Sequence, residues 1–244
     1  AGACMIHLHV RDGRLGHSLD PTLYQQAIAA IRQRVGRELI IQITTEAMGI
    51  YSPQQQAAAV HQVRPEAVSL ALREFCPDPG GEAFAAEFFN WLHQAGIYAQ
   101  YILYDAADIA RLKDLRRRGL IPGEQVAVLL VLGRYSKNLE SEPSQLPPLV
   151  AAVEADWLWS ACAFGRREQE CMAAAISLGG HCRVGFENNL FLASGELAPD
   201  NAALVAAVRD QVRELQRLEV SADQAREMLR NTVARPDSLP ARQE

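Results

Sequence analysis

The sequence lacks features that would define several protein classes. Its five cysteines are an odd number with no Cys-X-X-Cys pair, which disfavours a disulfide framework and favours reduced thiols in a cytoplasmic protein. No apolar stretch reaches the ~18 residues needed to span a bilayer, and no signal-peptide pattern is present. Lys and Arg total 24 against 29 Asp and Glu, a mildly acidic balance that argues against nucleic acid as the main partner.

The chain has the size and composition of a globular protein. Of its 244 residues, 49% are apolar, enough for a sizeable core in one large domain or two small ones. We expect a single barrel domain over residues 1–230 and a disordered tail over residues 231–244. Because the sequence enters a strand within a few residues of Ala1, we expect ~35 further residues, about one βα unit, ahead of it.

Short apolar runs alternate with amphipathic stretches along the chain. The runs predict strands at Cys4–Val10, Glu38–Thr45, Ala67–Leu72, Tyr98–Tyr104, Gln125–Leu132, Trp157–Phe164 and His181–Glu187. Helical patterns lie at Pro21–Val35, Pro53–Val63, Glu82–Ala95, Ala106–Arg118, Pro147–Ala155, Arg167–Leu178, Asn201–Leu218 and Ser221–Leu229. This alternation predicts an α/β fold, a (β/α)8 TIM barrel lacking its first β/α unit. A doubly wound open sheet is the alternative, but no Gly-X-Gly-X-X-Gly loop follows any strand.

His7 and His9 form the most informative pair in the sequence. Residues i and i+2 of a strand point to the same face, so two imidazoles leave this strand side by side and offer a metal two nitrogens. The alternative interpretation is two core histidines bonded to backbone groups. In a βα barrel, the site residues lie where the strands end.

Other strand ends carry polar side chains as well. Thr44 and Thr45 supply hydroxyls suited to a carboxylate or carbonyl, although β-propensity explains them equally well. Ser69 and then Arg73 and Glu74 follow at the next strand end. Their charged pair is either a loop salt bridge or faces the substrate.

The last predicted strand ends in an unusual cluster. Arg183, Gly185 and Glu187 alternate on one face of it, and a carboxylate there is costly to bury unless it is paired or binds a metal. We therefore expect Glu187 to join His7 and His9 as the third ligand of a catalytic divalent metal, with zinc favoured.

These residues together resemble the β-keto acid cleavage enzymes. The resemblance covers nearly all of the chain to about Leu229. It rests on Ala-Gly-Ala-Cys-Met-Ile-His-Leu-His-Val-Arg-Asp at 1–12, Leu-Ile-Ile-Gln-Ile-Thr-Thr at 39–45, Trp-Ser at 159–160, Gly-Arg at 165–166, Gly-Gly-His-Cys-Arg-Val-Gly-Phe-Glu-Asn-Asn at 179–189, and Asn-Ala-Ala-Leu-Val at 201–205.

The resemblance implies a zinc-dependent enzyme that converts a β-keto acid and acetyl-CoA into acetoacetate and a new acyl-CoA by Claisen and retro-Claisen chemistry. It implies that His7, His9 and Glu187 hold the metal and that Thr44 and Ser69 supply substrate-binding hydroxyls. Arg183 and Asn188 are the candidate catalytic residues, and Thr45 and Glu74 are further candidates for substrate binding.

Three departures from the family pattern bear on specificity. Asn188 stands where members often have Asp, and an amide cannot serve as a general base. Arg73-Glu74 stands where many members have Gly-Ser, so the substrate pocket differs. The family's N-terminal strand, with an acidic residue near the site, is absent from this sequence.

Two alternatives to a cleavage enzyme remain at this point. An amidohydrolase-type hydrolase also uses His-X-His on a barrel strand, but it needs further histidines on later strands, whereas His61 and His93 fall in predicted helices and His181 starts its strand. The other alternative is an inactive metal-binding barrel relative. The sequence leaves the oligomeric state open, but barrel enzymes of this type tend to associate, so we expect a homo-oligomer with small-molecule substrates.

Overall fold

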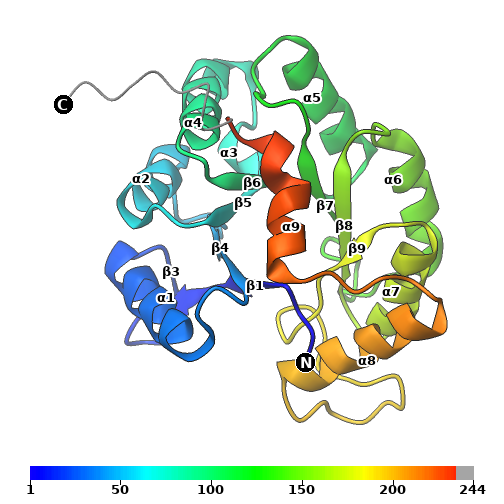
Figure 1. Ribbon diagram of the computed structural model, residues 1–244. Helices are drawn as coiled ribbons and strands as arrows, with labels where there is room; N and C mark the ends of the chain where they lie inside the picture. Colours follow the sequence, from blue (N-terminus) through cyan, green and yellow to red (C-terminus); the bar gives the residue numbers. More distant parts are fainter. Residues whose placement is uncertain (235–244) are drawn as a thin grey trace. The chain divides into compact units, whose positions relative to one another are not determined.

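The computed structural model describes residues 1–234 of the chain and confirms the α/β class (Figure 1). Its strands are β1 (Met5–Leu8), β2 (Val10–Arg11), β3 (His17–Ser18), β4 (Ile40–Thr44), β5 (Ala67–Ala71), β6 (Tyr98–Leu103), β7 (Ala127–Leu132), β8 (Leu158–Ala163) and β9 (His181–Cys182). Its α-helices are α1 (Pro21–Val35), α2 (Pro53–Val63), α3 (Leu72–Phe75), α4 (Glu82–Gln94), α5 (Ala106–Arg117), α6 (Leu146–Ala152), α7 (Glu168–Ser177), α8 (Asn201–Glu214) and α9 (Ala222–Leu229). Three 3-10 helices, η1 (Pro79–Gly81), η2 (Pro143–Gln145) and η3 (Arg230–Thr232), complete the described elements.

The strands form a seven-stranded sheet in the order β1-β4-β5-β6-β7-β8-β9, and β2 pairs with β3 in a separate antiparallel hairpin. The pairings β1–β4, β4–β5 and β8–β9 are parallel. Every residue of β4, β5 and β7 is buried, which explains their near-continuous apolar sequences. Each of these seven strands lies within a run predicted from the sequence, but β9 covers only the first two residues of its predicted run, His181–Glu187.

By their internal contacts the residues divide into two compact units. One unit holds Ala1–Ala3, Ile102–Arg111 and Val128–Ser221, and the other holds Cys4–Tyr101, Leu112–Ala127 and the chain from Ala222 onward. In the unit that begins at Cys4, α1 packs against α2; in the other, α7 packs against β8 and α8 (Figure 1).

Local sequence signals set the helix boundaries. Asp20 accepts a hydrogen bond from the Thr22 N–H at the start of α1, and Pro21 takes the first helical position. Ser52 and Gln55 form a reciprocal capping box at the start of α2. These caps explain why both helices have the predicted bounds.

Helix α9 closes the amino ends of the strands in its unit. Ala222 and Ala225 pack on Ile40 and Ala67, the first residues of β4 and β5. The polar residues predicted at the carboxyl ends of these strands therefore lie at the opposite end from α9, where a parallel α/β sheet carries its site.

The predicted tail begins within a described segment. Residues 231 and 232 belong to η3, and His93 Nδ1 lies 3.2 Å from the Thr232 carbonyl oxygen. Residues 235–244 of the predicted tail lie outside the described residues.

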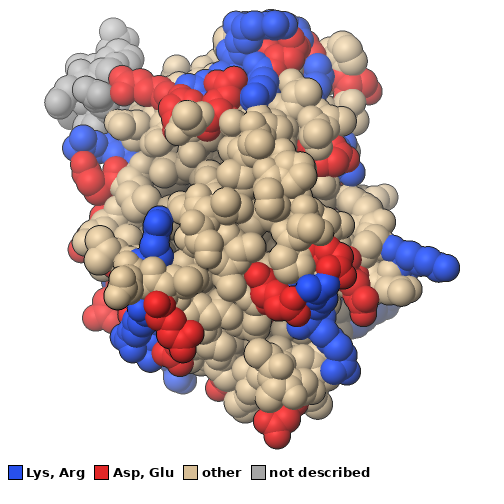
Figure 2. Space-filling view, turned by 90° about the vertical axis from the view of Figure 1, so that its right-hand side faces the viewer, with Lys and Arg blue, Asp and Glu red and all other residues tan. Residues whose placement is uncertain are grey.

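The surface charges and the lengths of the helices are two features relevant to binding partners. On the face drawn in Figure 2, basic groups lie next to acidic ones, with uncharged surface between the clusters. Across the helices of residues 1–234, none is long and apolar enough to cross a membrane.

Candidate active site

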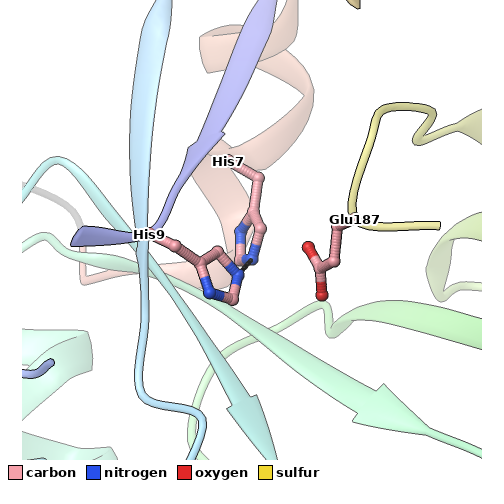
Figure 3. A group of neighbouring side chains, drawn as sticks. All are labelled: His7, His9 and Glu187. Atoms are coloured by element: carbon pink, nitrogen blue, oxygen red, sulfur yellow. Dashed lines mark hydrogen bonds between the residues drawn. The ribbon is translucent and has the colours of Figure 1, made fainter. Parts of the chain in front are cut away.

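The two predicted histidine ligands lie side by side. His7 belongs to β1 and His9 follows it, one residue after the strand. Their Nε2 atoms lie 3.0 Å apart, and the ring centroids are 4.9 Å apart at an interplanar angle of 73°. Both side chains are half-buried, and Figure 3 shows their rings pointing toward one another. The i, i+2 spacing therefore produces the arrangement that it predicts.

A glutamine from the neighbouring strand occupies the other side of the His7 ring. Gln42 is the register partner of His7 in the β1–β4 pairing, and its Oε1 lies 2.8 Å from His7 Nδ1. The Gln42 amide nitrogen donates to Gln100 Oε1 at 3.3 Å. This orientation makes Gln42 Oε1 an acceptor, so the His7 Nδ1–H donates to it, and in the neutral ring Nε2 then carries the lone pair.

Two residues outside the predicted site, Glu46 and His17, lie beside His9. Glu46 Oε2 lies 3.8 Å from His9 Nδ1, and the His17 ring centroid is 5.8 Å from that of His9. His17 Nε2 lies 2.8 Å from the Glu46 carbonyl oxygen. His9, His17 and Glu46 form a group whose potential metal-ligand atoms lie within 4.8 Å of one another. In the sequence, the one sign of a site role for Glu46 is its position two residues after the end of a strand.

Thr44 and Ser69 share the face of the sheet that carries His7. Gln42 bonds to His7 on that face, Thr44 lies two residues further along β4, and Thr44 is in register with Ser69. Ser69 is 1% exposed, and its hydroxyl has no hydrogen-bond partner within residues 1–234. A buried orphan hydroxyl of this kind is unusual and fits a group that awaits a ligand.

Thr45 and Glu74 have different positions. Thr45 points to the opposite face of β4 from Thr44, and its hydroxyl donates to the Ser69 carbonyl at 2.9 Å. Glu74, in α3, accepts a hydrogen bond from the Ala47 N–H at 2.9 Å. Both side chains tie together the chain segments around the ends of β4 and β5.

The other unit carries Arg183 and Glu187, but not on a strand. Strand β9 ends at Cys182, so the predicted strand His181–Glu187 is wrong beyond that residue. Gly185 has a φ of +156°, and its carbonyl accepts from the Asn188 and Asn189 N–H groups, which forms a turn instead. The turn brings Arg183 Nη2 to 3.3 Å from Glu187 Oε2.

Asn188 is held beside the end of β8. Its carbonyl accepts from the Gly165 N–H at 3.1 Å, and the residue is 8% exposed. The buried Asn188 Nδ2 has no hydrogen-bond partner among the described residues. The side chain thus retains donor capacity in a position where the sequence predicts catalysis.

A buried carboxyl group lies under the Gly185 turn. Glu168 begins α7 and is fully buried; Asn189 Nδ2 donates to its Oε2 at 3.1 Å. Burial raises the pKa of Glu168 to about 7, although hydrogen bonds from Asn189 and from the Gly185 backbone oppose the shift.

The buried cysteines are unsuited to nucleophilic chemistry. Burial raises the pKa of Cys162 to about 11, although Arg183 lies nearby, and raises that of Cys182 to about 12. A thiol with so high a pKa is protonated near neutral pH. All five cysteines lie within residues 1–234, and none of them forms a disulfide there.

Paired histidines and hydroxyl groups lie at the carboxyl ends of parallel strands, the place where α/β enzymes carry their active sites. The sequence pattern of the family described as beta-keto acid cleavage enzyme matches residues 1–230, and the chain belongs to this family. The resemblance read from the motifs is thereby confirmed, and the hydrolase alternative loses its basis.

Relatives with assigned activities match across most of their length. The chain is 28% identical to 3-keto-5-aminohexanoate cleavage enzyme of Fusobacterium nucleatum subsp. nucleatum, over 94% of this chain and 84% of the relative. It is 25% identical to 3,5-dioxohexanoate:acetyl-CoA acetone transferase of Paraburkholderia graminis, over 93% and 83%. It is 26% identical to 3-oxoadipate:acetyl-CoA acetyltransferase of Cupriavidus necator, over 94% and 81%.

Proposed function

We propose that this chain is a β-keto acid:acetyl-CoA acyltransferase of the (β/α)8-barrel type. A β-keto acid R-CO-CH2-COO⁻ and acetyl-CoA give acetoacetate and R-CO-CoA. One carbon–carbon bond forms and one breaks, and the thioester passes from the acetyl group to the R-CO group. Family membership and the acetyl-CoA named in two of the relatives support this reaction.

We propose that a divalent metal, zinc by ligand type, is held by His7, His9 and Glu187. The observation that carries this proposal is the histidine pair. Two nitrogens that each lie about 2.0–2.1 Å from one ion are at most about 4 Å apart, and the two Nε2 atoms are 3.0 Å apart. When bound, the metal would polarise the keto acid as a Lewis acid.

The chain's own residues would bind and orient the keto acid. The Ser69 hydroxyl, buried without a partner among the described residues, and the Thr44 hydroxyl on the same face can hydrogen-bond carbonyl or carboxylate oxygens. The Arg183 guanidinium, already beside Glu187, can orient that carboxylate and hold a substrate carboxylate. Thr45 and Glu74 support the pocket through the backbone bonds described above.

Asn188 takes a role as donor in this proposal. An amide holds no proton-accepting base, but its Nδ2 can donate to an oxygen on which negative charge develops. The buried Nδ2, which lacks a partner in residues 1–234, suits that task. Proton transfer then belongs to another group than Asn188.

Metal analysis of the purified chain tests the proposal. We expect about one zinc per chain in the wild type and none in the His7→Ala/His9→Ala variant. His93→Ala is the matched control, because His93 lies beside the Thr232 carbonyl instead, and it should keep the metal. Zinc retained by the double variant, or absent from the wild type, would contradict the proposed site.

A further inference from the structure

The proposed metal site, on which this inference rests, requires both histidine rings to be held in a fixed orientation. We infer that Gln42 and Glu46, at the middle and just beyond the end of β4, are positioning residues for His7 and His9. Each lies on the Nδ1 side of one ring. Together they keep both Nε2 lone pairs directed at one point, so that the metal meets a preformed pair of ligands.

The side chain of Gln42 is a buried amide with a partner for each of its polar atoms. Gln42 is 2% exposed within the apolar strand Ile40–Thr44, and a buried amide is costly unless its polar atoms are bonded. Its two partners are His7 Nδ1 at 2.8 Å and Gln100 Oε1 at 3.3 Å. Since Gln100 receives the amide protons, Oε1 faces His7 as an acceptor, and this fixes the His7 proton on Nδ1.

Glu46 acts on His9 through the negative charge of its carboxylate. At 3.8 Å from His9 Nδ1 its carboxylate is too distant for a hydrogen bond but within ion-pair range, and both side chains are 23% exposed. The Glu46 backbone is fixed on both sides: its N–H donates to Thr44 Oγ1 at 3.0 Å, and its carbonyl faces His17 Nε2 at 2.8 Å. The carboxylate therefore lies on the Nδ1 side of the His9 ring, whereas the Nε2 atom of that ring faces His7.

The two Nε2 atoms lie 3.0 Å apart, and when one metal binds both of them, each neutral ring carries its proton on Nδ1. Two lone pairs at that distance repel unless a proton or a cation lies between them. Metal-binding histidines commonly donate their second N–H to a carboxylate or carbonyl, and loss of that partner typically weakens metal binding roughly 10–100-fold. Gln42 and Glu46 meet this description with one neutral and one charged acceptor.

Zinc affinity of the full chain, measured by competition with a chromophoric chelator, tests the inference. Gln42→Leu and Glu46→Ala remove the acceptors, whereas Gln42→Glu and Glu46→Gln keep an acceptor oxygen in nearly the same volume. Gln56→Leu is the matched control, because Gln56 is a fully buried glutamine of α2 in the same unit whose amide contacts the Tyr51 carbonyl.

We expect Gln42→Leu and Glu46→Ala each to bind zinc roughly 10–100-fold more weakly, and both acceptor-keeping variants to recover most of that loss. Gln56→Leu should bind as the wild type does. Nitrogen-15 spectra of the zinc-loaded wild type should show both rings protonated at Nδ1, and Gln42→Leu should lose the slowly exchanging His7 proton. A purely structural role would leave this signature unchanged.

The contrary outcomes separate the two proposals. If the wild type binds zinc through His7 and His9 but Gln42→Leu and Glu46→Ala match Gln56→Leu, the positioning role is wrong and the metal site stands. If the wild type binds no zinc, both proposals fail. A second zinc per chain that is lost in His17→Ala would make Glu46 a ligand in the His9, His17 and Glu46 group and would overturn its positioning role.

Discussion

The buried carboxyl group of Glu168 should make the stability of the chain depend on pH. Its pKa is raised from an ordinary value of 4.5 to about 7, chiefly by burial. The folded state therefore binds more protons than the unfolded state between these values, and the free energy of unfolding falls as pH rises through this window. The difference of about 2.5 units corresponds to about 3 kcal/mol, present below pH 4.5 and lost above pH 7.

Urea unfolding at pH 5 and pH 8 measures this loss. Glu168→Gln keeps a neutral side chain of the same size at both pH values, so its stability should fall less than that of the wild type over this interval, by as much as about 3 kcal/mol. Glu170→Gln, an exposed position on the same helix, should retain the wild-type dependence. Parallel curves for the wild type and Glu168→Gln would show that the carboxyl group is ionised throughout and would refute the reasoning.

Three further changes have defined outcomes. Gly165 has a φ of +89°, and a Cβ there would lie 2.8 Å from the Leu139 carbonyl oxygen, so Gly165→Ala should lower the free energy of unfolding by about 1–3 kcal/mol; Gly195→Ala, with φ of +87° and open space, should cost less in the same denaturation assay. Ser69→Ala should leave the free energy of unfolding unchanged, because the hydroxyl has no partner in the described chain. The KM for the keto acid should rise roughly tenfold, because one hydrogen bond to the substrate is lost. An unchanged KM would show that Ser69 does not contact the substrate. Arg183→Lys should lower kcat/KM by roughly tenfold or more, because an ammonium group cannot reproduce the planar array of N–H donors of a guanidinium. Steady-state kinetics would measure this change.

The sequence predicts those parts of the molecule that depend on local periodicity. Helices α1 and α2 have the predicted bounds because Pro21 and Pro53 follow capping residues. The pairing of His7 with His9 follows from the two-residue period of a strand and needs no knowledge of the fold.

What the sequence does not predict depends on turns and on contacts between distant segments. Strands of two residues are too short to show a periodic pattern of apolar residues. The hairpin that brings His17 beside His9 therefore cannot be predicted from the sequence. The roles proposed for Gln42 and Glu46 require the register of β1 on β4. The strand predicted to reach Glu187 ends at Cys182, and the backbone turns at Gly185, which has a positive φ. An alternation of residue types resembles a strand even where the backbone turns.

The fate of the acetyl group tests the proposed reaction most directly. The chain is incubated with carbon-13 acetyl-CoA and a panel of β-keto acids, and the products are analysed by mass spectrometry. We expect the label to enter acetoacetate, while an unlabelled acyl-CoA carrying the substituent of the keto acid appears in equal amount. Neither product should form with His7→Ala/His9→Ala. Label found only in free acetate, or products formed equally by the double variant, would contradict the proposed reaction.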